Sequence, residues 1–106
     1  MNSKKKGSNG ERELLRLLEP YEAERHEQRY IGGLGNPDIS FVLGGTLFHC
    51  ECKRVERLNI HAAFAQASRD AQGGAVPVVA HRRNREPWLV TMKLDDFLRR
   101  DNAIQK

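Results

Sequence analysis

The stretch that decides the fold is NPDISFVLGGTLFHCECKRV, residues 36–55. Apolar and polar residues alternate on both sides of Gly44-Gly45, a dipeptide that tolerates the positive φ angles of a tight hairpin turn. We therefore expect an antiparallel hairpin with the strands Asp38–Leu43 and Thr46–Val55. Because successive side chains of a strand point to opposite faces, the return strand has an apolar face and a polar face. The apolar face carries Phe48, Cys50 and Cys52, and the polar face carries His49, Glu51, Lys53 and Val55.

The segments around the hairpin predict three helices and two more strands. Ser8-x-x-Glu11 is a capping-box pattern, so we expect a first helix to begin near Ser8. Pro20 can kink this helix, end it near Glu19 or start a second short helix. A second helix is expected from Asn59 to Gly73. Two strands, Ala75–His81 and Trp88–Met92, and a short C-terminal helix follow. The order α-β-β-α-β-β-α predicts the α/β class, with a small mixed β-sheet flanked by helices.

Length and composition limit the chain to one domain with a basic surface. Of its 106 residues, we expect 1–7 to be a disordered basic arm and 8–106 to form the single domain. The net charge of +4 favours a polyanionic partner such as nucleic acid. No apolar run reaches the ~18 residues of a membrane span. The two cysteines, two positions apart, give no disulfide framework, which favours a reducing cytoplasm.

Three polar residues of the hairpin point to one chemistry. Glu51 and Lys53 leave the same face of a strand, with Cα atoms about 6.5 to 7 Å apart. Asp38 begins the partner strand, directly after Pro37. Carboxylates on paired strands can hold a hard divalent cation such as Mg²⁺, and a neighbouring lysine can orient or help deprotonate the attacking water. The arrangement is typical of metal-assisted phosphodiester hydrolysis.

Glu11 is a fourth candidate for the same site. Helical spacing places it on the apolar stripe that is expected to face the sheet, between Leu14 and Leu15. A carboxylate that faces inward needs a partner, and a metal-bound water would supply one.

These residues resemble a known nuclease superfamily. Pro37-Asp38, followed by Glu51-Cys52-Lys53 after a Gly-Gly hairpin, resembles the PD-(D/E)xK superfamily. The opening GSNGERE, residues 7–13, resembles the GxxxERE start of its Holliday junction resolvase branch, in cellular and phage forms. The resemblance runs from about Lys6 to Leu98 and implies a restriction-endonuclease-like core. It implies Mg²⁺ or Mn²⁺ as cofactor and the active-site residues Glu11, Asp38, Glu51 and Lys53, with the main-chain carbonyl of Cys52 as an extra metal ligand and Glu11 bound to the metal through water.

The resemblance also suggests further residues and a partner. Several nuclease branches carry a glutamine on the helix after the ExK element, which makes Gln66 a candidate for contact with the metal-bound water or the scissile phosphate. The family implies a homodimer that places two cuts symmetrically, and Phe97, Leu98 and Ile104 are candidates for its apolar contact.

Basic residues supply candidate contacts to DNA phosphates. Arg12 and Arg29 occupy positions where resolvases place basic residues. Three basic clusters supply the other candidates: Lys4, Lys5 and Lys6; Arg54 and Arg57; and Arg82, Arg83 and Arg85. The sequence has no recognition helix or zinc finger and few aromatic residues, so recognition of DNA shape and backbone fits better than base reading.

The same residues have plainer interpretations, which stay open. Glu51 and Lys53 can form an ordinary salt bridge, Asp38 an Asx turn, Glu11 only a capping box, and Gln66 and the basic clusters solvated faces. A zinc site of His49 with Cys50 and Cys52 is disfavoured, because His49 leaves the opposite face of the strand. We expect both cysteines and Trp88 to pack in the core.

Together these features predict a metal-dependent, structure-selective DNA endonuclease. We expect it to resolve four-way (Holliday) junctions by paired phosphodiester cuts, in DNA recombination and repair, in a cytoplasm of phage or prokaryotic origin. One alternative is a VRR-NUC-like or nicking nuclease on other branched DNA. Another is a non-catalytic DNA-binding module that uses the basic arm and the turn at residues 82–85. The carboxylates favour an enzyme, because without a metal they would repel a phosphate.

Overall fold

The computed structural model describes the backbone of residues 3–26 and 38–104 and the side chains of residues 9–26 and 39–99. It confirms the predicted α/β class, a small mixed sheet flanked by helices. The elements in chain order are α1 (Ser3–Leu18), the 3₁₀ turn η1 (Glu19–Tyr21), β1 (Glu24–His26), β2 (Asp38–Leu43), β3 (Thr46–Arg54), α2 (Ile60–Asp70), β4 (Val76–Arg82), β5 (Leu89–Thr91) and α3 (Leu94–Ile104).

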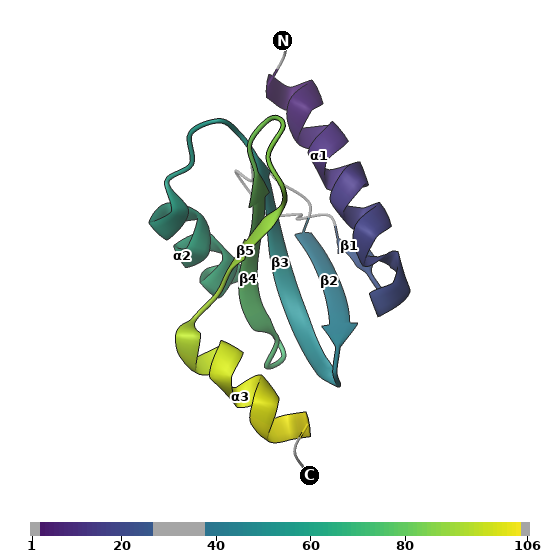
Figure 1. The fold of residues 1–106 in the computed structure, drawn as a ribbon, viewed down its shortest axis with the longest axis vertical. Coiled ribbons are helices and arrows are strands. Elements are labelled where there is room, and N and C mark those ends of the chain that lie inside the picture. The colour runs from purple at the N-terminus through teal and green to yellow at the C-terminus, as the bar shows by residue number, and fades with distance from the viewer. Residues whose placement is uncertain (1–2, 27–37, 105–106) are drawn as a thin grey trace.

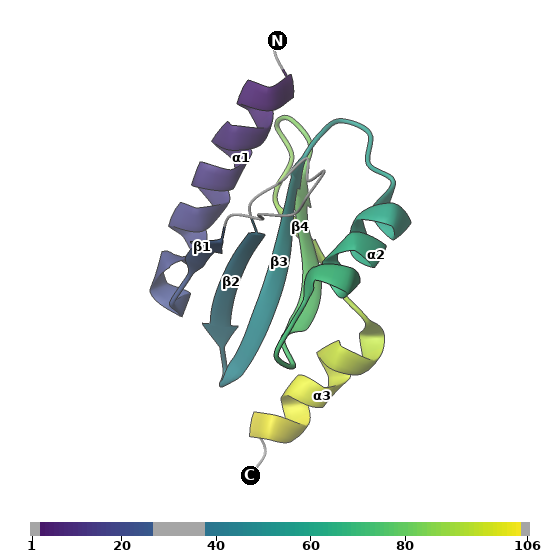
Figure 2. The ribbon, with the colours of Figure 1, turned by 180° about the vertical axis from the view of Figure 1, so that it is seen from behind.

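The five strands form one sheet in the order β1-β2-β3-β4-β5. β3 and β4 are parallel, and the other neighbouring strands are antiparallel. Parallel strands need a crossover connection, which α2 provides. Helix α1 covers one face of the sheet and α2 the other, as the two opposite views show (Figure 1, Figure 2). No described helix is long and apolar enough to span a membrane.

The central hairpin forms as the sequence predicts. Gly44 and Gly45 make the turn with φ angles of 59° and 78°, a conformation that residues with a Cβ rarely adopt. Phe41 pairs with Phe48 across the two strands, and their rings stack with centroids 5.0 Å apart. This cross-strand pair fixes the register, and a slip by one residue would send each side chain to the wrong face.

Helix α1 differs from the prediction at its N-terminus. It begins at Ser3 rather than near Ser8, so residues 3–7, expected as a disordered arm, are helical. Ser8 and Glu11 therefore lie inside the helix instead of capping it. Lysine is a good helix former, which allows the basic segment to extend the helix backwards. The C-terminal end agrees with the prediction, because α1 stops at Leu18 and Pro20 lies in η1.

Two further differences concern β1 and α2. Strand β1 was not predicted, because its three residues are charged and exposed and carry no apolar alternation. Asn59 caps α2 as expected, since its Oδ1 accepts a hydrogen bond from the backbone N–H of Ala62 at 3.0 Å. The helix ends at Asp70, three residues before Gly73, and this earlier end decides where the Asp70 carboxylate lies.

The two faces of the sheet have separate cores. The core under α1 is large and apolar and contains Leu14, Ile39, Phe41, Phe48, Cys50, Val78 and Ala80. The core under α2 is small and contains Ala63, Ala67 and Val79. As predicted, Cys50 is buried in a core and Trp88 packs against one.

Candidate metal centre

Strand β3 supplies side chains to both faces of the sheet. Cys50 pairs with Val78 and belongs to the core under α1. Glu51 pairs with Val79, which packs against α2. Paired residues of adjacent strands point to the same face, so Glu51 and His49 face α2. Both side chains are buried, and that of Glu51 is only 1% exposed.

The end of α2 brings a third polar side chain to this place. Asp70, the last residue of α2, lies against His49 and Glu51, so that one possible ligand atom from each residue lies within 4.8 Å of the others. Nε2 of His49 is 3.4 Å from Oε2 of Glu51. Imidazole and carboxylate groups are common metal ligands. This buried group could hold a metal ion.

The carboxylate of Glu51 is poorly satisfied by the protein itself. Its Oε2 atom is buried and makes no hydrogen bond within the described part of the chain. A buried carboxylate oxygen that lacks a hydrogen bond is costly, because water no longer solvates it. The cost falls if a cation occupies the space that Oε2 faces.

Three other predicted site residues lie close to Glu51. Lys53 follows two positions later in β3, on the same face and paired with His81. The backbone of Asp38 lies beside Glu51, because the next residue, Ile39, is paired with Cys50; the side chain of Asp38 lies outside the described residues. Gln66 is half-buried and lies one turn before Asp70, on the same side of α2. The main-chain carbonyl of Cys52 lies between Glu51 and Lys53 in the strand.

Glu11 is not brought into this group. It lies on the side of the sheet that α1 covers and forms an ion pair with Arg25 of β1. The thiol of Cys52 shows where the Glu11 carboxylate lies. Burial, as the larger cause, and the negative charge of Glu11, as the next, raise the pKa of Cys52 to about 12. Glu11 therefore lies near Cys52, on the face opposite to that of Glu51.

Glu13 joins α1 to the hairpin of β4 and β5. Its Oε1 accepts hydrogen bonds from Nε of Arg82 and Nε1 of Trp88, both at 2.9 Å. The Arg82 guanidinium also lies 5.9 Å from the centre of the Trp88 ring. The side chain of Arg82, a predicted DNA contact, is thus held against α1 by Glu13.

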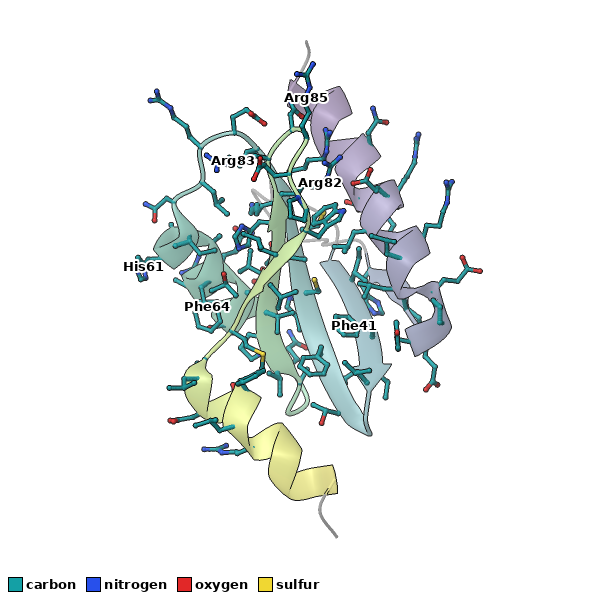
Figure 3. All side chains as sticks on the ribbon, viewed as in Figure 1. Phe41, His61, Phe64, Arg82, Arg83 and Arg85 are labelled. Carbon is teal, nitrogen blue, oxygen red and sulfur yellow. The ribbon has the colours of Figure 1, made fainter. Side chains whose placement is uncertain are left out.

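Three of the other predicted DNA contacts are exposed around the ends of β3 and β4. Arg57 and Arg83 line a groove of about 530 Å³ beside His81, and Arg85 lies at the tip of the following turn (Figure 3). His81 donates to or accepts from Oγ1 of Thr91 at 2.9 Å, and burial lowers its pKa.

The remaining predicted DNA contacts are more scattered. Arg54 lies so close to α1 that a Cβ atom added at Gly10 would come within 2.6 Å of the Cβ atom of Arg54. Arg12 is exposed beside Arg25, on the outer side of α1. Arg29 and the side chains of Lys4, Lys5 and Lys6 lie outside the described residues.

Sequence reasoning found Glu51 but not its two neighbours in the cluster. His49 was placed correctly on the face of Glu51, opposite the cysteines, and its spacing of two residues was the available signal. Asp70 carries no comparable signal, because its position depends on where α2 ends and how the helix packs on β4.

Comparison with models of protein families, with curated proteins and with solved structures finds no match to this chain. The resemblance to the PD-(D/E)xK superfamily therefore stays a hypothesis carried by the residues quoted above.

Proposed function

We propose that this protein is a metal-dependent DNA endonuclease that cuts branched DNA, with four-way junctions as its preferred substrate. The observation that carries the proposal is the buried carboxylate of Glu51, with Lys53 two residues further on the same face. Asp38 begins the neighbouring strand beside Glu51. The resemblance of these residues to the PD-(D/E)xK pattern supports the same chemistry.

The residues suit a catalytic divalent cation such as Mg²⁺ or Mn²⁺. Glu51 and Asp38 would hold it, together with the carbonyl of Cys52, whereas Glu11 lies on the opposite face of the sheet in an ion pair with Arg25. The ion would supply charge stabilisation for the phosphodiester and acidify a water molecule. Lys53 would orient that water and offset the negative charge that develops on the phosphate. Gln66 would contact the same water or the phosphate.

The surface around the ends of β3 and β4 supports DNA as the substrate. Arg57 and Arg83 line a groove there, and Lys53 pairs with His81 of the same groove. Guanidinium groups bind phosphate oxygens in two-pronged geometry. Glu56 and Glu86 line the groove as well, and it lies at the end of β3, the strand that carries Glu51.

Two copies of the chain would cut one junction twice. One domain has one Glu51 site, so paired cuts need a dimer. Phe97 and Leu98 of α3 are more than half exposed and remain candidates for its contact, while the side chain of Ile104 lies outside the described residues.

The test is cleavage of labelled linear, nicked, flap and four-way DNA, with Mg²⁺ and with chelator. We expect paired, symmetric cuts in the junction that stop when the metal is removed. Glu51→Gln should lower the rate at least about 100-fold, the usual loss when a group that stabilises transition-state charge is removed. Glu19→Gln, at an exposed glutamate of η1, is the matched control and should cleave as the wild type does.

Other outcomes assign other functions. Cuts in flaps or nicks alone would replace the resolvase by a different structure-selective nuclease. Junction binding that needs no divalent ion, with no cleavage by the wild type, would leave a DNA-binding module that uses the exposed arginines Arg57, Arg83 and Arg85. Cleavage by Glu51→Gln at the wild-type rate would overturn the site.

A further inference from the structure

The cluster of His49, Glu51 and Asp70 differs from the ligand set of the proposed nuclease site. It contains a nitrogen ligand, and it joins two elements, β3 and the last residue of α2. Of the proposed catalytic residues only Glu51 belongs to it, so the two sites share this one carboxylate and differ in every other ligand. What the cluster can bind is therefore a separate question from whether the protein cuts DNA.

The distances within the cluster suit a metal ion. With metal–ligand bonds of about 2.1 Å, neighbouring ligand atoms lie about 3.4 Å apart in a tetrahedron and about 3.0 Å apart in an octahedron. The distance from Nε2 of His49 to Oε2 of Glu51 is 3.4 Å. All three ligand atoms lie within 4.8 Å of one another.

The buried oxygen of Glu51 is the independent sign of a ligand. The side chain is 1% exposed, and Oε2 points at His49 without forming a hydrogen bond among the described residues. Among the described residues, the basic side chain within ion-pair distance of Glu51 is that of His49, at 3.4 Å. The carboxylate is thus buried, and its Oε2 atom can accept a cation.

Charge favours a cation with more than one positive charge. Two carboxylates and one imidazole leave the cluster negative even when the imidazole is protonated. Asp70 also ends α2, where the helix dipole adds partial negative charge. A divalent ion would neutralise this charge in a place that solvent reaches poorly.

We propose that His49, Glu51 and Asp70 bind a divalent transition-metal ion of the Zn²⁺ and Co²⁺ class and that this ion fastens the end of α2 to β3. The imidazole ligand decides the class, because imidazole suits these ions, whereas Mg²⁺ prefers an all-oxygen octahedron. Three protein ligands leave one position of a tetrahedral ion for water.

The test is titration of chelator-treated, full-length protein with Co²⁺, followed by visible absorption and equilibrium dialysis. We expect one Co²⁺ per chain, a spectrum typical of low coordination number, and a higher unfolding temperature. A thousandfold excess of Mg²⁺ should not displace it. His49→Gln and Asp70→Asn should each weaken binding at least about 100-fold, since even residues that only support metal ligands contribute 10- to 100-fold.

Matched controls replace the same residue types outside the cluster. His61→Gln, on the exposed side of α2, and Asp95→Asn, in the first turn of α3, should bind Co²⁺ as the wild type does. Circular dichroism of each variant separates lost binding from lost folding.

A measurement on the wild type alone tests the same metal site if the variants do not fold. Histidine ring ¹⁵N resonances followed during Zn²⁺ addition should show one imidazole that changes strongly, that of His49, while His61 stays unchanged. No metal uptake, uptake without a change at His49, or displacement by equimolar Mg²⁺ would overturn the proposal. Failure of DNA cleavage would leave it intact, because none of these measurements uses DNA.

Discussion

The two faces of the sheet are built from the same strands but differ in chemistry. Under α1, bulky residues such as Phe41 and Phe48 form a continuous apolar core. Under α2, the buried residues are fewer and smaller or polar: Ala63, Ala67, Val79, His49 and Glu51. The difference indicates that the first face carries most of the stability. The face under α2 leaves room for a polar site. The apolar core on the opposite face holds in place the strand that carries the residues of this site.

Phe48→Ala tests this comparison with the largest expected effect. Phe48 is 2% exposed and stacks on Phe41 in the core under α1. Replacing a buried phenylalanine by alanine costs about 3 to 5 kcal/mol, from lost burial and the cavity left behind. Domains of this size are stable by only about 5 to 15 kcal/mol, so the variant should lie close to unfolding. Urea denaturation followed by circular dichroism measures the loss.

Leu47→Ala is the matched control in the same strand. Leu47 is 42% exposed, so its truncation should cost about 1 kcal/mol or less. Equal losses of unfolding free energy for the two variants would contradict the inference that the core under α1 carries most of the stability.

The hairpin and its faces could be predicted from the sequence because their determinants are local. Alternation and the Gly44-Gly45 turn fix both strands without reference to the rest of the chain. Strand β1 could not be predicted, since its three polar residues show no apolar alternation and pair with β2 only once the chain has folded. That strand supplies Arg25, whose ion pair holds Glu11 on the α1 side.

The part of the candidate site that lies on a single strand could also be predicted from the sequence. Glu51 and Lys53 share a face because of their spacing, and so does His49. Asp70 joins them through the packing of α2 across β4, a contact between residues far apart in the sequence. The prediction therefore found the part of the site on one strand and missed the part that depends on tertiary packing.

Glu13→Ala tests whether α1 is also held by polar contacts, with a medium expected effect. The Glu13 carboxylate accepts hydrogen bonds from Arg82 and Trp88, and these tie α1 to the hairpin of β4 and β5. Hydrogen bonds to a charged group contribute about 1.5 to 3 kcal/mol each when sheltered, but Glu13 is partly exposed. We expect a loss of about 1 to 2 kcal/mol in urea denaturation.

Arg16→Ala provides the control for Glu13, because Arg16 is an exposed residue of the same helix. Its replacement should change stability by no more than about 0.5 kcal/mol. A loss for Glu13→Ala as small as that for Arg16→Ala would show that the apolar core alone holds α1.

His81→Gln tests the polar character of the face under α2, with the smallest expected effect. Burial lowers the pKa of His81 below the ordinary value of 6.5, while its ring bonds to Thr91. As the pH falls, the unfolded chain therefore takes up this proton before the folded protein does. Stability from the neutral imidazole is present above pH 6.5 and is lost as the pH falls through the lower, folded-state pKa.

Comparison with the variant isolates the contribution of His81 to the pH dependence of stability, because the two proteins share all other titrating groups. Glutamine can keep a hydrogen bond to Thr91 but cannot titrate. The wild type should therefore lose stability relative to His81→Gln between pH 7 and pH 5, as measured by urea denaturation at a series of pH values. A constant difference would show that the His81 ring is solvated equally in both states. Water would then reach the α2 side of the sheet around His81, and only the region around the buried Glu51 would exclude it.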